Sequence, residues 1–475
     1  MRIIRRHDAL VADDVITPVH HHSDESKDVY VAQTPDGTQP VSPERAAVIA
    51  SECSLIRDIE DVPVADDGPT GLGGVRRRGL LQAAGVGLGA LLVPTAVPRL
   101  AFDASSAEDV VVCVFLRGGM DGLSAVVPVA DPNYYRLRPT TGVKPEQTWS
   151  LDGSYGMNST MSALRPMWEE RDLAVVLGAG NPEVTRSHFD DMDTMELAQG
   201  SAPAQVRTGW LARHLASMSK PGGTFRAITI GNRVATSLTT NAFEALAMTD
   251  IKSFDILDWS GERDDMLASL DAMYRTAGGE LASVADATMS AVTGMADLRD
   301  GTDSPDGGAV YPGTPFGRGL RDVARIIKAG KGLQAACVDL GGWDHHSELT
   351  GQFSTLSEQL AKGLAAFRAD LGPAWEKTTV VTMSEFGRRA RQNSAEGTDH
   401  GHGNLMMFAG GGVRGGIYGS QPRLETANLE LGEDVPTQHD YRTGLSEMLT
   451  DRLGNGANLD AIFPGYRQTT PLDIF

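Results

Sequence analysis

The stretch DVVVCVFL, Asp109–Leu116, is the strongest indication of the fold. It is apolar at successive positions and rich in valine, which is typical of a strand buried on both faces of a parallel sheet. Five later runs have the same character: LAVVLGAG (Leu173–Gly180), FRAITIG (Phe225–Gly231), LQAACVDLGG (Leu333–Gly342), KTTVVTM (Lys377–Met383) and LMMFAGGG (Leu405–Gly412). Together these runs predict a central, mostly parallel sheet.

Amphipathic stretches lie between the predicted strands. The clearest is QFSTLSEQLAKGLAAFRADLG, Gln352–Gly372, in which apolar residues recur at spacings of three and four. Strands that alternate with such helices predict an α/β fold with helices on both faces of the sheet. Residues 250–310 are rich in Met, Ala and Asp without a strong strand pattern, and we expect a helical insertion there.

The first hundred residues differ from the rest. Residues 1–75 are acidic and polar with no sustained periodicity, which predicts a disordered leader. Residues 76–104 begin with three arginines and continue as an uncharged, glycine-rich apolar stretch. A membrane span needs about 20 strongly apolar residues, so this segment fits an export signal better, with an uncleaved anchor as the alternative. RRGLLQ, Arg77–Gln82, is similar to the twin-arginine signal, and cleavage is expected within 101–107.

These features predict an exported protein whose residues 105–475 form a single α/β domain. The formal net charge of −20 argues against a nucleic-acid partner, because phosphate backbones are bound by clustered Lys and Arg. Cys53, Cys113 and Cys337 are too few and too scattered for a disulfide framework or a structural zinc site. We expect Cys113 and Cys337 to be inert thiols within buried strands.

Ligands of parallel sheets collect beyond the carboxyl ends of the strands. The segments that follow predicted strands are RGGMDGLS (Arg117–Ser124), NPEVTRSHFDDMD (Asn181–Asp193), WDHHSE (Trp343–Glu348) and SEFGRRARQNSAEGTDHGHGN (Ser384–Asn404). Five of the seven histidines beyond residue 100 lie in these segments, each near an aspartate. Imidazole and carboxylate ligands together suit Zn, Mn or Fe better than Mg or Ca. The sequence therefore predicts a site for a divalent metal at this edge.

Each candidate also has an ordinary structural explanation. Asp121, between glycines, can stabilise a tight turn. His345 and His346 cannot easily face one site from extended backbone, so we prefer His346 as the ligand. His402 can be a residue of the outer shell or of the surface.

The motifs RGGMDGLS, RSHFD, GGWDHHS, SEFGR and TDHGHGN, in this order behind a twin-arginine-like signal, resemble the DUF1501 family of exported bacterial proteins. That family is placed in the alkaline phosphatase-like superfamily, with sulfatases and phosphodiesterases. The resemblance implies an alkaline phosphatase-like fold and the hydrolysis of a phosphate or sulfate ester. Its substrate would be a small-molecule or polymer ester, and the export machinery of the twin-arginine route would be a partner.

The resemblance also implies roles for single residues. The metal ligands would be Asp121, Asp344, His346, Glu385, His400 and His402. At SEFG the sequence departs from the superfamily's SDHG signature, because Phe386 cannot bind a metal. The site would then hold one ion, or two with His188 or His402 compensating.

Ser187 is the candidate nucleophile, because in that superfamily a Ser or Thr lies at a helix N-terminus where backbone N–H groups favour anionic oxygens. Arg186 would bind the oxygens of the transferred group, and the adjacent His188 belongs to the same catalytic segment. Alternatively, Ser187 and Asp190 form only a helix cap, and Ser124 is the reserve nucleophile. A different class of function also stays open: an exported metal-binding or scaffolding protein without turnover.

Overall fold

The computed structural model describes residues 109–199, 206–218, 223–255, 289–301, 304–467 and 470–475, with the shorter stretches 2–5, 30–34, 37–41, 267–270 and 272. The chain divides into two compact units, Met1–Val75 and Arg76–Phe475. In the first unit, β1 (Arg2–Arg5), β2 (Tyr30–Thr34) and β3 (Gly37–Val41) form an antiparallel sheet that was not expected in this acidic segment. The predicted signal segment and Cys53 lie outside the described residues.

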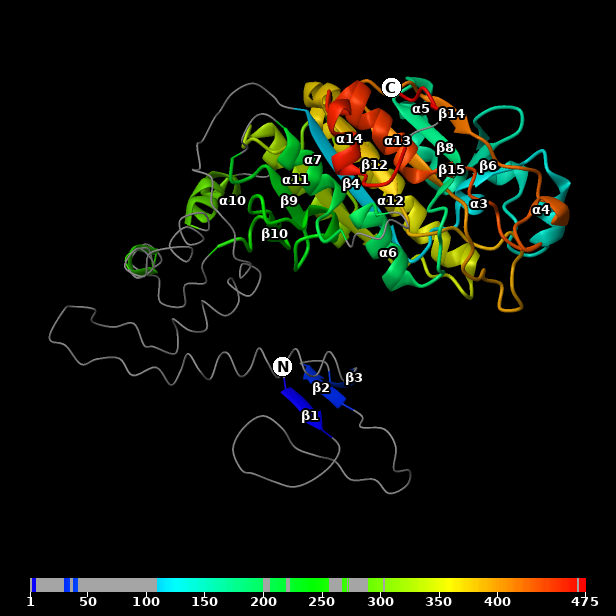
Figure 1. The fold of residues 1–475 in the computed structure, drawn as a ribbon, viewed down its shortest axis with the longest axis horizontal. Coiled ribbons are helices and arrows are strands. Elements are labelled where there is room, and N and C mark those ends of the chain that lie inside the picture. The colour runs from blue at the N-terminus through cyan, green and yellow to red at the C-terminus, as the bar shows by residue number, and fades with distance from the viewer. Residues whose placement is uncertain are drawn as a thin grey trace. The chain divides into compact units, whose positions relative to one another are not determined.

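The second unit is built around a nine-stranded sheet in the order β10-β9-β11-β4-β12-β13-β8-β14, with β15 paired to β8. All six predicted strands are present: β4 (Val110–Arg117), β8 (Leu173–Gly180), β9 (Ala227–Ile230), β11 (Ala335–Gly341), β12 (Thr378–Met383) and β13 (Asn404–Gly410). Three short strands were not predicted: β10 (Leu246–Met248), β14 (Gly416–Gly419) and β15 (His439–Asp440). The parallel strands β4 and β12 lie next to each other in the middle of the sheet (Figure 1).

The sheet is mostly parallel, as predicted, and β13 is the exception. This strand runs antiparallel to both β12 and β8. The long loop from Ser384 to Gly403 therefore leaves the carboxyl end of β12 and enters the amino end of β13 at the same edge of the sheet. Because of that reversal, the histidines that precede β13 lie at the edge where the parallel strands end.

Helices cover both faces of the sheet, which confirms the predicted fold class. Alternate residues of β4 belong to two different cores, Val112 and Val114 to one, and Val111 and Cys113 to the other. The first core includes α11 (Pro315–Lys328) and α12 (Leu349–Leu371), and the second includes α7 (Trp210–Ser217), α13 (Tyr441–Glu447) and α14 (Leu459–Ile462). Helix α12 starts three residues before the predicted Gln352. Cys113 and Cys337 are buried and form no disulfide, as predicted.

The remaining elements are short. The helices are α3 (Gly122–Ala125), α4 (Pro132–Leu137), α5 (Arg165–Glu169), α6 (His188–Leu197) and α10 (Ala296–Asp300). A small sheet joins β5 (Val126–Val127), β6 (Thr148–Ser150) and β7 (Gly156–Asn158). Short 3₁₀ helices are η1 (Pro145–Gln147), η2 (Ser159–Leu164), η3 (Thr236–Leu238), η4 (Gly372–Lys377), η5 (Thr426–Asn428) and η7 (Gly456–Asn458), and η6 (Met448–Arg452) is a π-helix.

The predicted helical insertion at 250–310 lies largely outside the described residues, and α10 falls within it. Among the helices that the structure describes, none combines the length and the apolar character that a membrane crossing requires.

Candidate metal centre

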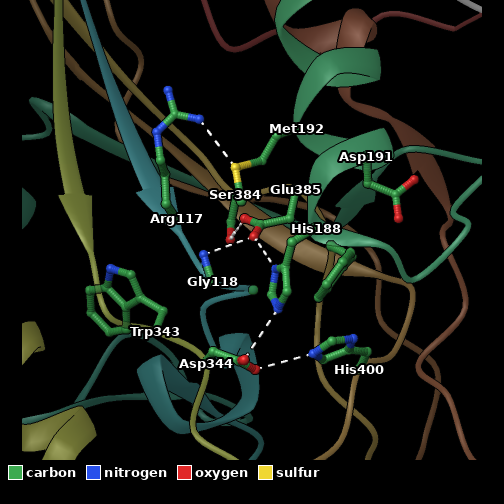
Figure 2. A network of polar contacts seen from close by, with 12 residues as sticks. Arg117, Gly118, His188, Asp191, Met192, Trp343, Asp344, Ser384, Glu385 and His400 are labelled. Carbon is green, nitrogen blue, oxygen red and sulfur yellow. Dashed lines mark hydrogen bonds and ion pairs between the residues drawn. The ribbon is translucent and has the colours of Figure 1, made fainter. Parts of the chain in front are cut away.

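Four side chains from separate segments meet at the carboxyl edge of the sheet. His188 is the first residue of α6, Asp344 and His346 follow β11, and His400 precedes β13. Asp344 Oδ1 lies 3.0 Å from His346 Nε2 and 3.1 Å from His400 Nε2, and the two Nε2 atoms are 3.0 Å apart. His188 Nε2 lies 3.4 Å from Asp344 Oδ2. Figure 2 shows the rings of His188 and His400 directed at Asp344 from two sides.

The hydrogen bonds around the cluster fix the tautomers of its three rings. Each Nδ1 atom faces an acceptor: Glu385 Oε1 at 2.6 Å from His188, Asp399 Oδ1 at 3.0 Å from His346, and the backbone oxygen of Arg186 at 2.9 Å from His400. A carbonyl or carboxylate oxygen only accepts, so Nδ1 carries the proton and a neutral ring presents a lone pair at Nε2. Metal-binding histidines are held in this way by acceptors of the outer shell.

The three Nε2 atoms thus converge on the carboxylate of Asp344, and each of them offers a lone pair when its ring is neutral. His188 Nε2 is buried and has no hydrogen-bond partner within the part of the chain that the structure describes. One ligand atom from each of His188, Asp344 and His400 lies within 4.8 Å of the other two, and His346 adds a fourth. Such lone pairs repel one another unless a cation lies between them. The donor set therefore fits a divalent metal, and imidazole with carboxylate is a set suited to Zn, Mn or Fe.

The charges around the cluster favour anionic Asp344. Burial opposes its ionisation, but the hydrogen bond and the charge of Arg388 outweigh burial and lower the pKa of Asp344 to about 2. The hydrogen bond to Glu385 raises the pKa of His188 above its ordinary value, against the effect of burial. Burial lowers the pKa of His400. Asp344 is therefore an anion at neutral pH, whereas His400 is a neutral ring.

Arg388 forms the frame that holds Asp344. Its guanidinium is buried and donates to Asp344 Oδ1 at 2.7 Å. The same group donates to backbone carbonyls of the loops around it: Gly119 at 2.7 Å, Thr398 at 2.9 Å, Trp343 at 3.2 Å, and Gly118. One side chain thus joins the segments after β4, β11 and β12.

Glu385, a predicted ligand, orients a ligand instead of facing the cluster. Its Oε1 accepts from His188 Nδ1 and, at 2.8 Å, from the Gly118 N–H, and its Oε2 lies 3.3 Å from Ser384 Oγ (Figure 2). Phe386, at which the superfamily signature fails, is buried, with its ring centroid 4.8 Å from His188 and 4.7 Å from His400. Phe386, which stands where the superfamily signature has a ligand, thus provides an apolar surface on which His188 and His400 pack.

Asp121 does not join the cluster, contrary to the ligand set that the resemblance implied. It is buried, and both of its oxygens accept from Arg138, with Nη2 to Oδ1 at 2.9 Å. Ser124 Oγ donates to the same carboxylate at 2.6 Å. Burial raises the pKa of Asp121, but the charge of Arg138 outweighs it and leaves the pKa lowered. Asp121 is thus the anion of a buried ion pair with Arg138, and its carboxylate serves this pair and Ser124 and not the cluster.

His402 lies in a neighbouring group of charged residues and not in the cluster. Glu430 is the partner of its Nδ1, and its Nε2 accepts from Arg186 Nε at 3.3 Å. The Arg186 guanidinium also pairs with buried Asp434. It therefore does not point at the cluster, contrary to the expectation that it binds the transferred group. Arg186 acts instead through its backbone, at φ 66°, where its carbonyl accepts from His400.

Ser187 occupies the N-cap of α6. Its Oγ accepts from the Asp190 N–H at 3.4 Å, as the capping alternative predicted. The reserve candidate, Ser124, uses its hydroxyl for Asp121. His188, proposed as a catalytic residue or a compensating ligand, is the member of this segment that the structure brings to the cluster. His345 is buried outside it, as side-chain alternation predicted.

The fold and the cluster define an α/β protein with a candidate His/Asp metal centre at the carboxyl edge of its sheet. The sequence profile of a family described as a protein of unknown function, DUF1501, matches residues 173–451. The chain belongs to this family, which confirms the resemblance seen in its motifs.

Two solved structures are similar at low identity. One is the lipoteichoic acid synthase LtaP from Listeria monocytogenes, with 9% identity, a TM-score of 0.28 and coverage of 70% of this chain and 76% of that one. The other is a protein in the alkaline phosphatase superfamily from Vibrio parahaemolyticus, with 8% identity, a TM-score of 0.28 and coverage of 78% and 79%. No curated protein matches the chain.

Proposed function

We propose that this protein is an exported, metal-dependent hydrolase of phosphate or sulfate esters. The observation that carries the proposal is the convergence of His188, His346 and His400 on Asp344, each ring with its Nε2 atom directed inward. When bound, a divalent transition metal would polarise an ester oxygen and lower the pKa of a bound water towards about 7.

The exposure of the cluster supports a catalytic role over a closed structural site. The side chains of Asp344 and His346 are each 45% exposed, whereas that of Glu385 is fully buried. One side of the cluster is therefore fixed by the protein and the other is open to solvent. Catalytic metal sites keep such an open position, while structural sites are closed by protein ligands.

The chain's own residues hold the site rigid. Asn393 donates to Asp399 Oδ1 at 3.1 Å and to the His346 carbonyl at 2.9 Å, which secures the ring of His346. Attack by Ser187 would require its Oγ to leave the Asp190 amide, whereas attack by water requires no such movement. We therefore favour water over Ser187 as the attacking group.

The test uses the purified full-length protein. We expect about one bound ion per chain by elemental analysis, and turnover of at least one of three probes: an aryl phosphate, an aryl phosphodiester or an aryl sulfate. Asp344→Asn and His400→Ala remove both properties, because each deletes a ligand. His402→Ala is the matched control, since its ring lies in the neighbouring group and its loss leaves the ion bound. Ser187→Ala retains turnover if water attacks.

The second candidate is an exported metal-binding protein without turnover. It is favoured by the hydroxyls of Ser187 and Ser124, both of which are engaged in structural hydrogen bonds. A full complement of metal with no turnover of any probe supports this candidate and contradicts the hydrolase. A protein that binds no transition metal contradicts both.

Export through the twin-arginine route, with its machinery as a partner, is part of the proposal. It is supported by the RRGLLQ motif at Arg77–Gln82. Replacement of Arg77 and Arg78 by lysine is expected to keep the protein in the cytoplasm of a producing bacterium, measured by cell fractionation. Unchanged export of this double variant would contradict the assignment.

A further inference from the structure

A pocket of about 420 Å³ lies apart from the metal centre. Its walls are the loop after α4, the start of η2 and the first turns of α12. Its volume is within the range of about 300–1,000 Å³ that is typical of small-molecule sites. Its lining is unusual in composition, because side-chain hydroxyls dominate it: Ser124, Thr140, Thr141, Ser159, Thr160, Thr350 and Ser354.

The other lining groups restrict the ligand further. Lys144 and Glu146 contribute opposite charges, so the pocket has no excess of cations that would select an anion. An apolar ligand would take the hydroxyls out of water without replacing their hydrogen bonds, which is unfavourable. The exposed amide of Gln147 adds an N–H donor, whereas its oxygen accepts from the Lys144 N–H and the buried amide of Asn158 is bonded within the protein. The lining therefore suits a neutral ligand that carries many hydroxyl groups.

Two of the hydroxyls are available to a ligand. Ser159 and Thr350 are exposed, and their Oγ atoms make no hydrogen bond to any residue that the structure describes. The pocket also reaches one aromatic side chain, Phe353, but this residue is 2% exposed and packs edge-to-face on Trp343 at 5.6 Å between centroids, so it belongs to the core beside the pocket. Free hydroxyls within a lining rich in hydroxyl groups match a ligand that itself carries several hydroxyls, as a saccharide does.

From this lining we infer that the pocket binds a neutral carbohydrate. One wall of the pocket is fixed by Gln392, whose Oε1 accepts from the backbone N–H groups of Thr140 and Thr141, both at 3.0 Å. The next residue, Asn393, holds Asp399 and His346 at the metal centre. Because the wall is anchored by the protein itself, carbohydrate binding requires neither a bound metal nor hydrolysis.

The experiment is saturation-transfer NMR on the full-length protein with glucose, N-acetylglucosamine, maltose and glycerol as probes. We expect signal from at least one saccharide, and weaker binding in the double variant Ser159→Ala, Thr350→Val. The loss of each hydroxyl corresponds to roughly twofold to tenfold in affinity. The matched control is Thr355→Val, because Thr355 is an exposed threonine of α12 that bonds its own helix at Gly351 and does not line the pocket.

The outcomes separate this inference from the proposed hydrolase. Saccharide binding that weakens in the double variant but not in Thr355→Val, with metal content unchanged in both, supports the carbohydrate site. The absence of signal from every saccharide, or equal binding by the double variant, overturns it. Displacement of the saccharide by inorganic phosphate would also overturn it, since the pocket would then select anions.

Discussion

Replacement of Glu385 by glutamine tests whether this carboxylate serves the metal centre through His188. In the native protein, Glu385 Oε1 accepts from His188 Nδ1 at 2.6 Å, and the carboxylate is fully buried. Glutamine keeps the size of the side chain and an acceptor oxygen for the Gly118 amide. It removes the negative charge that strengthens the bond to His188 and makes the ring a better ligand.

The expected loss follows from the strength of that one bond. A hydrogen bond to a charged group contributes about 1.5–3 kcal/mol, against about 0.5–1.5 kcal/mol for a neutral pair. The difference of about 1.5 kcal/mol corresponds to roughly tenfold weaker metal binding, at the lower end of the range of about 10–100-fold seen for outer-shell partners. The equivalent change at His346, Asp399→Asn, is expected to cost less, about twofold to fivefold, because the Asp399 side chain is 43% exposed and its charge is screened.

The assay is competition with a chelator of known affinity for Zn²⁺ or Mn²⁺, at pH 8, where protons compete weakly for imidazole. Thermal melts of the metal-free proteins check that both variants are folded. The reasoning predicts an order of affinity: native, then Asp399→Asn, then Glu385→Gln. Native affinity in a folded Glu385→Gln protein, or a larger loss in Asp399→Asn, would refute the role assigned to Glu385.

Two further predictions concern stability. Asp121→Asn is expected to lower the free energy of unfolding by about 3–5 kcal/mol, because it leaves Arg138 as an uncompensated buried charge, while metal content stays native. Chemical denaturation and elemental analysis test this, and loss of metal from a folded variant would restore Asp121 as a ligand. Burial lowers the pKa of His214 to about 4, and its Nδ1 accepts from Asn455 at 2.8 Å. The contribution of neutral His214 to the free energy of unfolding is therefore complete above about pH 6.5 and declines as the pH falls towards 4. Denaturation between pH 7.5 and 4.5 should show a smaller decline in His214→Gln, and equal declines would contradict the assignment.

The sequence predicted most of the sheet because its strands are buried on both faces and carry continuous apolar runs. Those runs carry no information on direction, so the reversal of β13 could not be seen. The short strands β10, β14 and β15 were missed because a few residues do not establish a period.

For the site, the rule that ligands collect at strand ends pointed to the segments that hold Asp344, His346 and His400, and the family resemblance implied these residues as ligands. The ligand assignment was wrong for Asp121. Packing decides which group pairs with a buried carboxylate, and no sequence motif marked Arg138 as the partner of Asp121. The rule also could not distinguish a ligand from the residue that orients it, as at Glu385. The motif RSHFD marked His188 as a candidate. Its position at the cluster depends on the start of α6, which could not be predicted to the residue.

The bonds of Arg388 to Asp344 and to four surrounding carbonyls have a consequence for how the protein acquires its ion. The guanidinium of Arg388 itself holds the carboxylate and the surrounding loops in place, so their arrangement does not depend on a bound metal. In small zinc domains, by contrast, the binding free energy of the metal is the folding free energy, and chelation unfolds the chain. Here folding and metal loading are separable events: a chelator should empty the centre and leave a folded protein that can be reloaded with a different ion.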